Sequence, residues 1–117
     1  MSTIYDHAGA LKRMGNDEDL FHEMVGLLKA DAPPLIVTAQ NASRAGDVMQ
    51  LQRAAHTLKG LASNFGGQRA VSAAAELEGL AKNRQSMGVP AALTELEEAF
   101  DELIGALAPA AEMSRTH

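Results

Sequence analysis

The sequence predicts an all-α protein: an up-and-down antiparallel four-helix bundle with an additional short N-terminal helix. Apolar residues make up 46% of the 117 residues but aromatic residues only 3%, and the resulting Ala, Leu, Val and Met side chains suit helix packing better than sheets. Helix-length segments carry apolar residues at three- and four-residue steps, and Gly and Pro separate them. Because the links are short, consecutive helices should be antiparallel neighbours. We expect one domain over residues 1–107 and a frayed tail over 108–117.

The first half of the chain predicts three helical segments. A short helix, Asp6–Met14, should end at Gly15, and Asn16 should cap a second helix whose first turn is acidic. Pro33-Pro34 should break or bend that helix, and a third segment should then run to Gly46. The apolar stripe expected on the second helix is Leu20, Met24, Leu27 and Leu28; on the third it is Leu35, Ala39 and Ala42.

The second half predicts three longer helices. Asp47 should cap a helix over Val48–Phe65, which the pair Gly66-Gly67 should end. A further helix should cover Gln68–Asn83, and Pro90 should open the last one after a short loop. The inward positions expected on these last two helices are Ala70, Ala74, Leu77 and Leu80, then Leu93, Leu96, Phe100, Leu103 and Leu107.

Charge and composition exclude several classes of function. The net charge is −5 and no Lys/Arg cluster occurs, which argues against a nucleic-acid binder. There is no cysteine, so a disulfide framework and a thiolate metal site are excluded. No apolar run approaches the roughly 20 residues that cross a bilayer, and the N-terminus lacks the pattern of a signal peptide. We therefore expect a cytoplasmic protein without a membrane partner.

The helix over Val48–Phe65 should carry His56 at the centre of its outward face. Each residue of a helix advances by about 100°, which places His56 roughly opposite Phe65. The residues expected on the buried side are Leu51, Ala54, Leu58, Leu61 and Phe65. The residues expected on the same face as His56 are Met49, Gln52, Arg53, Lys59, Gly60 and Ser63.

The residue types around His56 favour phosphoryl chemistry. A neutral imidazole is a nucleophile near pH 7 and can form a phosphoramidate. Lys59, one turn away, could pair with the added negative charge, and Ser63 could donate a further hydrogen bond. Gly60 costs helix stability of about 1 kcal/mol relative to alanine. Because glycine has no side chain, this position beside an exposed nucleophile would let another protein approach closely.

Glu78 is a further candidate for the site. If the helices before and after Gly66-Gly67 form an antiparallel hairpin, His56 faces positions 77 and 78. Leu77 belongs to the apolar stripe, which leaves Glu78 near the imidazole. Its carboxylate could accept a hydrogen bond from one ring nitrogen and leave the other free. A plain solvated charge is the alternative interpretation of this residue.

The segment "AHTLKGLASNFGG" resembles the signature of histidine-containing phosphotransfer domains, the Hpt family of phosphorelays. The matching residues are Ala55, His56, Leu58, Lys59, Gly60 and the closing Gly66. "AELEGLA", over residues 75–81, resembles the next helix of that family, and "GNDEDLFHEMVGLL" and "AGDVMQLQRAAH" resemble its first half more loosely. The resemblance covers roughly Asp6 to Leu107.

The resemblance implies a phosphocarrier, not an enzyme, that exchanges a phosphoryl group between His56 and the aspartate of a response-regulator receiver domain. The receiver would hold the Mg²⁺ ion, so the chain itself would need no metal or cofactor. A hybrid histidine kinase would be a direct or indirect partner, and the chain would be a monomer. The docking surface implied around the histidine comprises Met49, Gln52, Arg53, Gly60, Ser63 and Asn64.

Three alternatives remain open from the sequence. A phosphoacceptor fragment of a sensor kinase would place an acidic residue after the histidine, where this chain has Thr57, and the chain has no room for an ATP-binding domain. A metal site would need ligand spacing that the four histidines, His7, His22, His56 and His117, do not have. A helical interaction module in which His56 is never phosphorylated is the third alternative.

Overall fold

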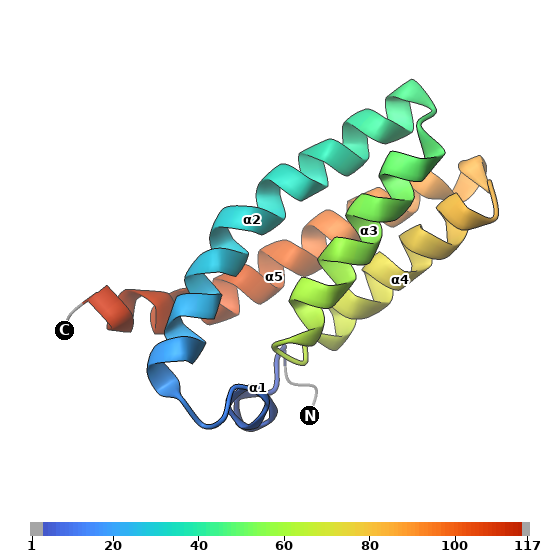
Figure 1. Cartoon of the computed structure of the whole chain (residues 1–117). Helices are drawn as coiled ribbons and strands as arrows, with labels where there is room; N and C mark the ends of the chain where they lie inside the picture. The colour runs from blue at the N-terminus through green and yellow to red at the C-terminus, as the bar shows by residue number, and fades with distance from the viewer. Residues whose placement is uncertain (1–3, 116–117) are drawn as a thin grey trace.

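The computed structural model describes the backbone of residues 4–115 and the side chains as far as residue 109. Four long helices form an up-and-down bundle, and a short helix lies across one end of it (Figure 1). The elements are α1 (His7–Arg13), α2 (Glu18–Ala45), α3 (Val48–Ser63), α4 (Gln68–Lys82), the 3-10 turn η1 (Ser86–Gly88) and α5 (Val89–Arg115). No strand occurs in residues 4–115. The predicted fold class is confirmed.

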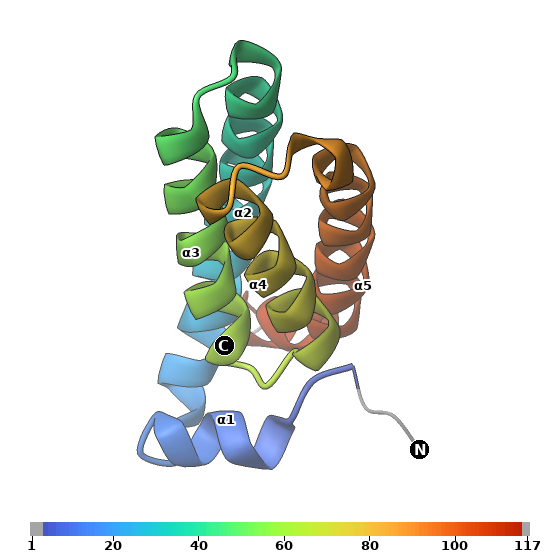
Figure 2. The ribbon, with the colours of Figure 1, turned by 90° about the vertical axis from the view of Figure 1, so that its right-hand side faces the viewer.

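The four long helices form a closed ring in which α2, α3, α4 and α5 each pack against two of the others. Figure 2 shows the α2–α3 turn and the α4–α5 link together at one end of the bundle, with α1 at the opposite end. Helix α5 extends through residues 108–115 of the expected tail, and residues 116 and 117 lie outside the described residues. No helix in the described part of the chain is long and apolar enough to cross a membrane.

Aspartates begin three of the helices. The side chains of Asp6, Asp17 and Asp47 each accept a hydrogen bond from a backbone N–H three residues further on, at 3.0–3.1 Å. The cap expected at Asn16 is wrong by one residue. Asn16 has a left-handed φ of 60°, and its N–H donates to the carbonyl of Leu11, so it completes the end of α1.

The break expected at Pro33-Pro34 is wrong, because α2 continues through both prolines. Each proline lacks the N–H that would bond to the carbonyl four residues earlier. Both prolines are exposed, so water can reach that side of the helix, while Ala32 and Ile36 anchor the other side in the core. The burial of one continuous stripe therefore keeps a single helix where two were expected.

The apolar stripe expected at the start of α2 is rotated by about one residue. Leu20 and Leu27 are 37% and 47% exposed, although Leu28 is buried as expected and Met24 is half-buried. The buried positions in this half of α2 are Phe21, Val25, Leu28 and Ala32. The aromatic Phe21, the largest apolar side chain there, takes the core position and sets the rotation of the helix.

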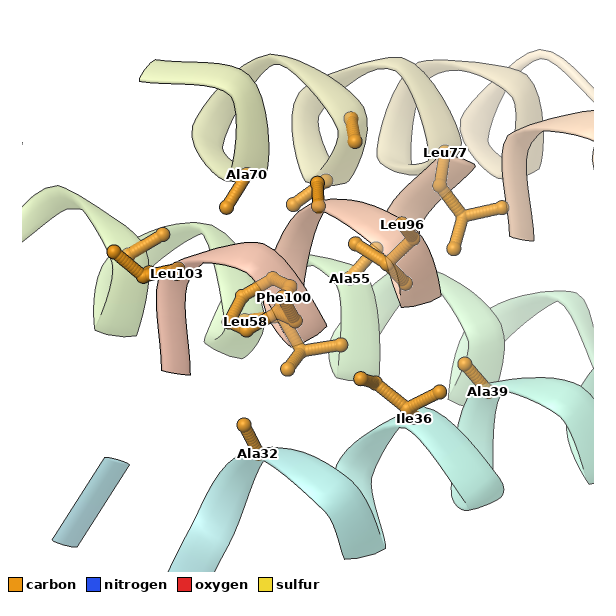
Figure 3. Packing of buried hydrophobic residues seen from close by; sticks show 14 of the residues in the cluster. Ala32, Ile36, Ala39, Ala55, Leu58, Ala70, Leu77, Leu96, Phe100 and Leu103 are labelled. Atoms are coloured by element: carbon orange, nitrogen blue, oxygen red, sulfur yellow. The ribbon is translucent and has the colours of Figure 1, made fainter. Parts of the chain in front are cut away.

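The core is built mainly from alanine and leucine, with three phenylalanines among its largest side chains. Figure 3 shows side chains from all four long helices pointing into one shared space. Small alanines let neighbouring helices approach, and leucines fill the centre. The inward positions predicted on α4 and α5 are buried, apart from Leu80 and Leu93, which are half-buried. No polar or charged side chain is buried in the described part of the chain.

Helix α1 fixes the end of α3. The N–H of Asp6 donates to the carbonyl of Phe65 at 2.8 Å, and the guanidinium of Arg13 donates to the carbonyl of Asn64 at 3.2 Å. The ring of Phe65 packs edge-on against Phe21, with centroids 5.8 Å apart. The C-terminal turn of α3 is therefore held from two sides.

Candidate functional site

Helix α3 presents His56 to solvent. Its side chain is 69% exposed, while Leu51, Ala54 and Leu58 on the opposite side of the helix are buried. Phe65, just beyond the helix, is also buried, and Leu61 is half-buried. The amphipathic pattern of α3 therefore gives the orientation that the sequence predicts for the histidine.

The turn after α3 requires glycine at position 66. Gly66 has a φ of +64°, and a Cβ at this position would lie 2.7 Å from the Cβ of Asp6. The turn directs α4 back along α3 as an antiparallel partner, and this pair packs together over its whole length (Figure 1). The register of the hairpin sets Glu78 against His56.

One carboxylate joins the two predicted site residues of α3. Glu78 Oε2 lies 2.8 Å from His56 Nδ1, and Glu78 Oε1 lies 2.7 Å from Lys59 Nζ. The side chains of Lys59 and Glu78 are 33% and 19% exposed. Sequence reasoning expects Glu78 near the imidazole, but it does not foresee that Lys59 is paired with the same carboxylate.

The pairing determines which nitrogen of His56 is free. The hydrogen bond from Lys59 lowers the pKa of Glu78 below its ordinary value of 4.5, and that from His56 acts in the same direction against partial burial. An ionised carboxylate can only accept hydrogen bonds, so Nδ1 of His56 must carry the proton. We therefore assign the Nδ1–H tautomer, which leaves the lone pair of Nε2 free when the ring is neutral.

A shallow hollow lies beside His56. Three residues expected on the docking surface, Met49, Gln52 and Arg53, line it together with His56, Glu78 and Thr57. Met49 is 67% exposed, so an apolar side chain is accessible in the lining of the hollow. Sequence reasoning does not include Thr57 among the site residues; the signal for it is its position directly after the histidine.

The other three expected docking residues differ in their surroundings. Apart from its chain neighbours and the backbone of its own helix, a Cβ added at Gly60 would meet no atom within 4 Å, so the helix surface is open there. The hydroxyl of Ser63 donates to the carbonyl of Lys59 at 2.8 Å, which engages it within its own helix. Asn64 lies at the contact with α1, where its carbonyl accepts from Arg13, and it does not line the hollow.

No group of three potential metal-ligating side chains gathers anywhere in the described residues. His7 packs edge-on against Phe21 at a centroid distance of 4.8 Å, and His22 contacts the same ring at 5.8 Å. Both therefore lie at the α1 end of the bundle, away from the contact between His56 and Glu78. His117 lies outside the described residues.

Comparison with known proteins shows the family of the chain. The family model of the Hpt domain matches residues 23–106, which is more than half of the chain. The chain belongs to the Hpt domain family. As a member of it, the chain is a histidine phosphotransfer protein, and the Hpt match includes α3 and α4 with all three residues of the contact around Glu78.

A solved structure has the same fold as this Hpt chain. The crystal structure of histidine-containing phosphotransfer protein B (HptB) from Pseudomonas aeruginosa PAO1 is similar to it with a TM-score of 0.84 and 20% sequence identity. The match covers 100% of this chain and 99% of the HptB chain, so it includes α1. No curated protein sequence matches the chain significantly.

Proposed function

We propose that this Hpt protein is a cytoplasmic phosphoryl carrier in a multistep two-component phosphorelay. It exchanges a phosphoryl group between Nε2 of His56 and the aspartate of a response-regulator receiver domain. The observation that carries the proposal is the contact in which Glu78 accepts from His56 Nδ1 while the ring stays 69% exposed. Such a contact fixes the tautomer without covering the nucleophile.

The proposed reaction is a reversible transfer between nitrogen and oxygen. Nε2 of His56 attacks the phosphorus of the receiver's aspartyl phosphate, the N–P bond forms, the P–O bond breaks, and the aspartate leaves as a carboxylate. Nδ1 keeps its proton, so a positive charge develops on the ring. Glu78, already 2.8 Å from Nδ1, stabilises this charge. The same steps in reverse return the group to an aspartate.

Lys59 supports the transfer from the same helix face. Its ammonium has three donors, of which one bonds to Glu78 at 2.7 Å, so others remain for the oxygens of a phosphoryl group. The receiver domain supplies the Mg²⁺ that neutralises the transferring group. We expect no metal or cofactor on this chain.

The proposed docking surface surrounds His56. Met49 offers exposed apolar area, Gln52 and Arg53 offer polar and cationic contacts, and the open surface at Gly60 lets the receiver approach the imidazole. We assign a smaller part to Ser63 and Asn64, because their polar groups already bond within the chain. We expect the carrier to act as a monomer, and a hybrid histidine kinase to reach it directly or through a receiver.

Phosphorylation of the chain by a receiver domain tests the proposal. Incubation with a receiver domain carrying a ³²P-labelled aspartyl phosphate should label the wild-type chain and leave His56→Gln unlabelled. The matched control His22→Gln, at the α1 end, should be labelled like wild type. A chain that no phosphorylated receiver labels would be a non-phosphorylated interaction module, and labelling by ATP alone would support a sensor-kinase fragment.

A further inference from the structure

A second pocket lies at the end of the bundle opposite α1, between the α2–α3 turn and the α4–α5 link (Figure 2). We call it the end pocket. Its apolar wall consists of Ala42, Val48, Leu51, Leu80, Ala81, Val89 and Pro90. Its volume is about 250 Å³. A cavity of about 150 Å³ already holds benzene, so the end pocket has room for a phenylalanine ring or a leucine side chain.

The end pocket has one cation without a side-chain partner in the described part of the chain, although the chain as a whole carries a charge of −5. The charged residues among those that line it are Arg84 and one carboxylate, Asp47. That carboxylate caps α3 by accepting from the N–H of Gln50 at 3.1 Å. Arg84 lines the pocket, and its guanidinium makes no hydrogen bond or ion pair with any side chain of the described residues.

The backbone conformation of Arg84 is a second unusual feature of this residue. Helices α1, α2, α3 and α4 all end in the same pair of backbone hydrogen bonds around a left-handed residue, and at α1 the following residue, Asn16, is left-handed as well. That residue is Gly15, Gly46 or Gly66 in the first three cases, as expected, because glycine adopts this conformation without strain. In α4 it is Arg84, with a φ of 56°. Arg84 therefore has a backbone conformation that costs free energy in a residue other than glycine, and its unpaired side chain lines the pocket.

An exposed methionine lies in η1, next in the chain to a residue that lines the pocket. Met87 is 96% exposed, and its neighbours in η1, Ser86 and Gly88, lead directly into Val89 of the pocket wall. Methionine is flexible and adapts its shape, which suits it to contacts with protein partners. An apolar pocket and an unpaired cation therefore lie together, and an exposed methionine directly follows Ser86 of the pocket lining in the chain.

We propose that the end pocket binds an acidic segment of a partner protein that inserts one leucine- or phenylalanine-sized side chain. The inserted side chain fills the apolar pocket, a flanking carboxylate pairs with Arg84, and Met87 contacts the segment. Charge complementarity selects an acidic occupant. This binding site goes beyond phosphoryl exchange, because Val48 and Leu51 line the end pocket while Met49 and Gln52 line the hollow at His56.

The test uses the unphosphorylated full chain and a synthetic peptide in which a central leucine–phenylalanine pair is flanked on each side by glutamates. In ¹⁵N-correlated NMR titrations, peptide binding should shift the amides of residues 42–51 and 80–90. Arg84→Glu should weaken binding by at least about tenfold, and Met87→Ser should weaken it several-fold. The matched charge change Lys12→Glu, at the opposite end of the molecule, should leave the affinity unchanged.

Two control peptides separate the parts of the proposal. Replacing the glutamates by lysines, or the leucine–phenylalanine pair by alanines, should abolish the shifts. Shifts centred on residues 49–57, or equal affinities of Arg84→Glu and Lys12→Glu, would overturn the proposal. Concentration-dependent shifts of the same amides without peptide would instead assign the end pocket to a second copy of this chain. No phosphoryl donor is present, so this test and that of His56 labelling can fail independently.

Discussion

At the scale of single residues, Glu78 determines the chemical state of the site. Its two oxygens bond to His56 and Lys59 at 2.8 and 2.7 Å, so one carboxylate fixes the tautomer of the imidazole and holds a cation beside it. The register of the α3–α4 hairpin makes the first contact predictable from the sequence. The contact between Lys59 and Glu78 depends on the conformation of a long lysine side chain that reaches the neighbouring helix. Residue spacing on α3 alone does not predict that conformation.

The first prediction concerns the pH dependence of stability at Glu78. Because the folded state lowers the pKa of Glu78 below 4.5, its contribution to stability is present above that pH and is lost as pH falls through the lowered pKa. Glu78→Gln should lower the free energy of unfolding by about 1 kcal/mol at pH 7. Urea unfolding at several pH values should show this difference shrinking below pH 4.5.

Glu76→Gln is the matched control for this measurement. Glu76 lies on the same helix, is exposed, and makes no hydrogen bond or ion pair with the described residues. Its substitution should leave the unfolding free energy nearly unchanged at every pH. If the loss of unfolding free energy in Glu78→Gln stayed constant from pH 7 to pH 3, the pairing with Lys59 would not be what lowers the pKa of Glu78.

The second prediction separates helix stability from docking at Gly60. An added Cβ meets no atom of this chain at Gly60 or at Gly26 on α2, and both glycines lie inside helices. Gly60→Ala and Gly26→Ala should therefore each raise the free energy of unfolding by roughly 0.5–1 kcal/mol, measured by urea titration. Only Gly60→Ala should slow phosphoryl transfer from a receiver, and equal transfer rates in both variants would remove Gly60 from the docking surface.

At the scale of elements, local sequence signals predicted the ends of α3 and α4 better than the course of α2. Asp47 and the left-handed φ of Gly66 act through backbone geometry within a few residues, so the local sequence predicts both ends, although the contact of Gly66 with Asp6 is not local. At Pro33-Pro34 the local signal for a break competes with the burial of Ala32 and Ile36 against other helices. Tertiary packing determines the structure there. The sequence pattern of one segment does not show how strongly that segment packs against another.

The third prediction measures the cost of a proline inside α2. The N–H restored by Pro34→Ala would donate to the carbonyl of Ala30 within a continuous helix. A proline inside a helix destabilises the folded state by about 3 kcal/mol. Proline also restricts the unfolded chain, which offsets about 1 kcal/mol of that cost. Pro34→Ala should therefore raise the free energy of unfolding by roughly 2 kcal/mol. Thermal and urea unfolding check it, and Pro90→Ala, at the start of α5, should give a much smaller change.

At the scale of the whole molecule, the ring of four helices and the cap formed by α1 play different parts. The family match covers residues 23–106 and so leaves α1 outside. Helix α1 buries Ala10 completely and bonds to the end of α3 through Asp6 and Arg13. It covers the bundle end where Phe21 and Phe65 meet. The ring of helices positions His56, and α1 seals one end of the core that supports it.

The fourth prediction follows from this division. A chain lacking residues 1–15 keeps Asp17 as the cap of α2 and keeps the complete ring of four helices. It should fold, lose roughly 2–3 kcal/mol of unfolding free energy because Phe21 and Phe65 become partly exposed, and retain labelling of His56 by a phosphorylated receiver. Arg13→Ala, which removes one hydrogen-bonding side chain and leaves α1 in place, should lose less. A truncated chain that is unfolded by circular dichroism would make α1 part of the folding unit, and a folded one that cannot be labelled would place α1 in the transfer step.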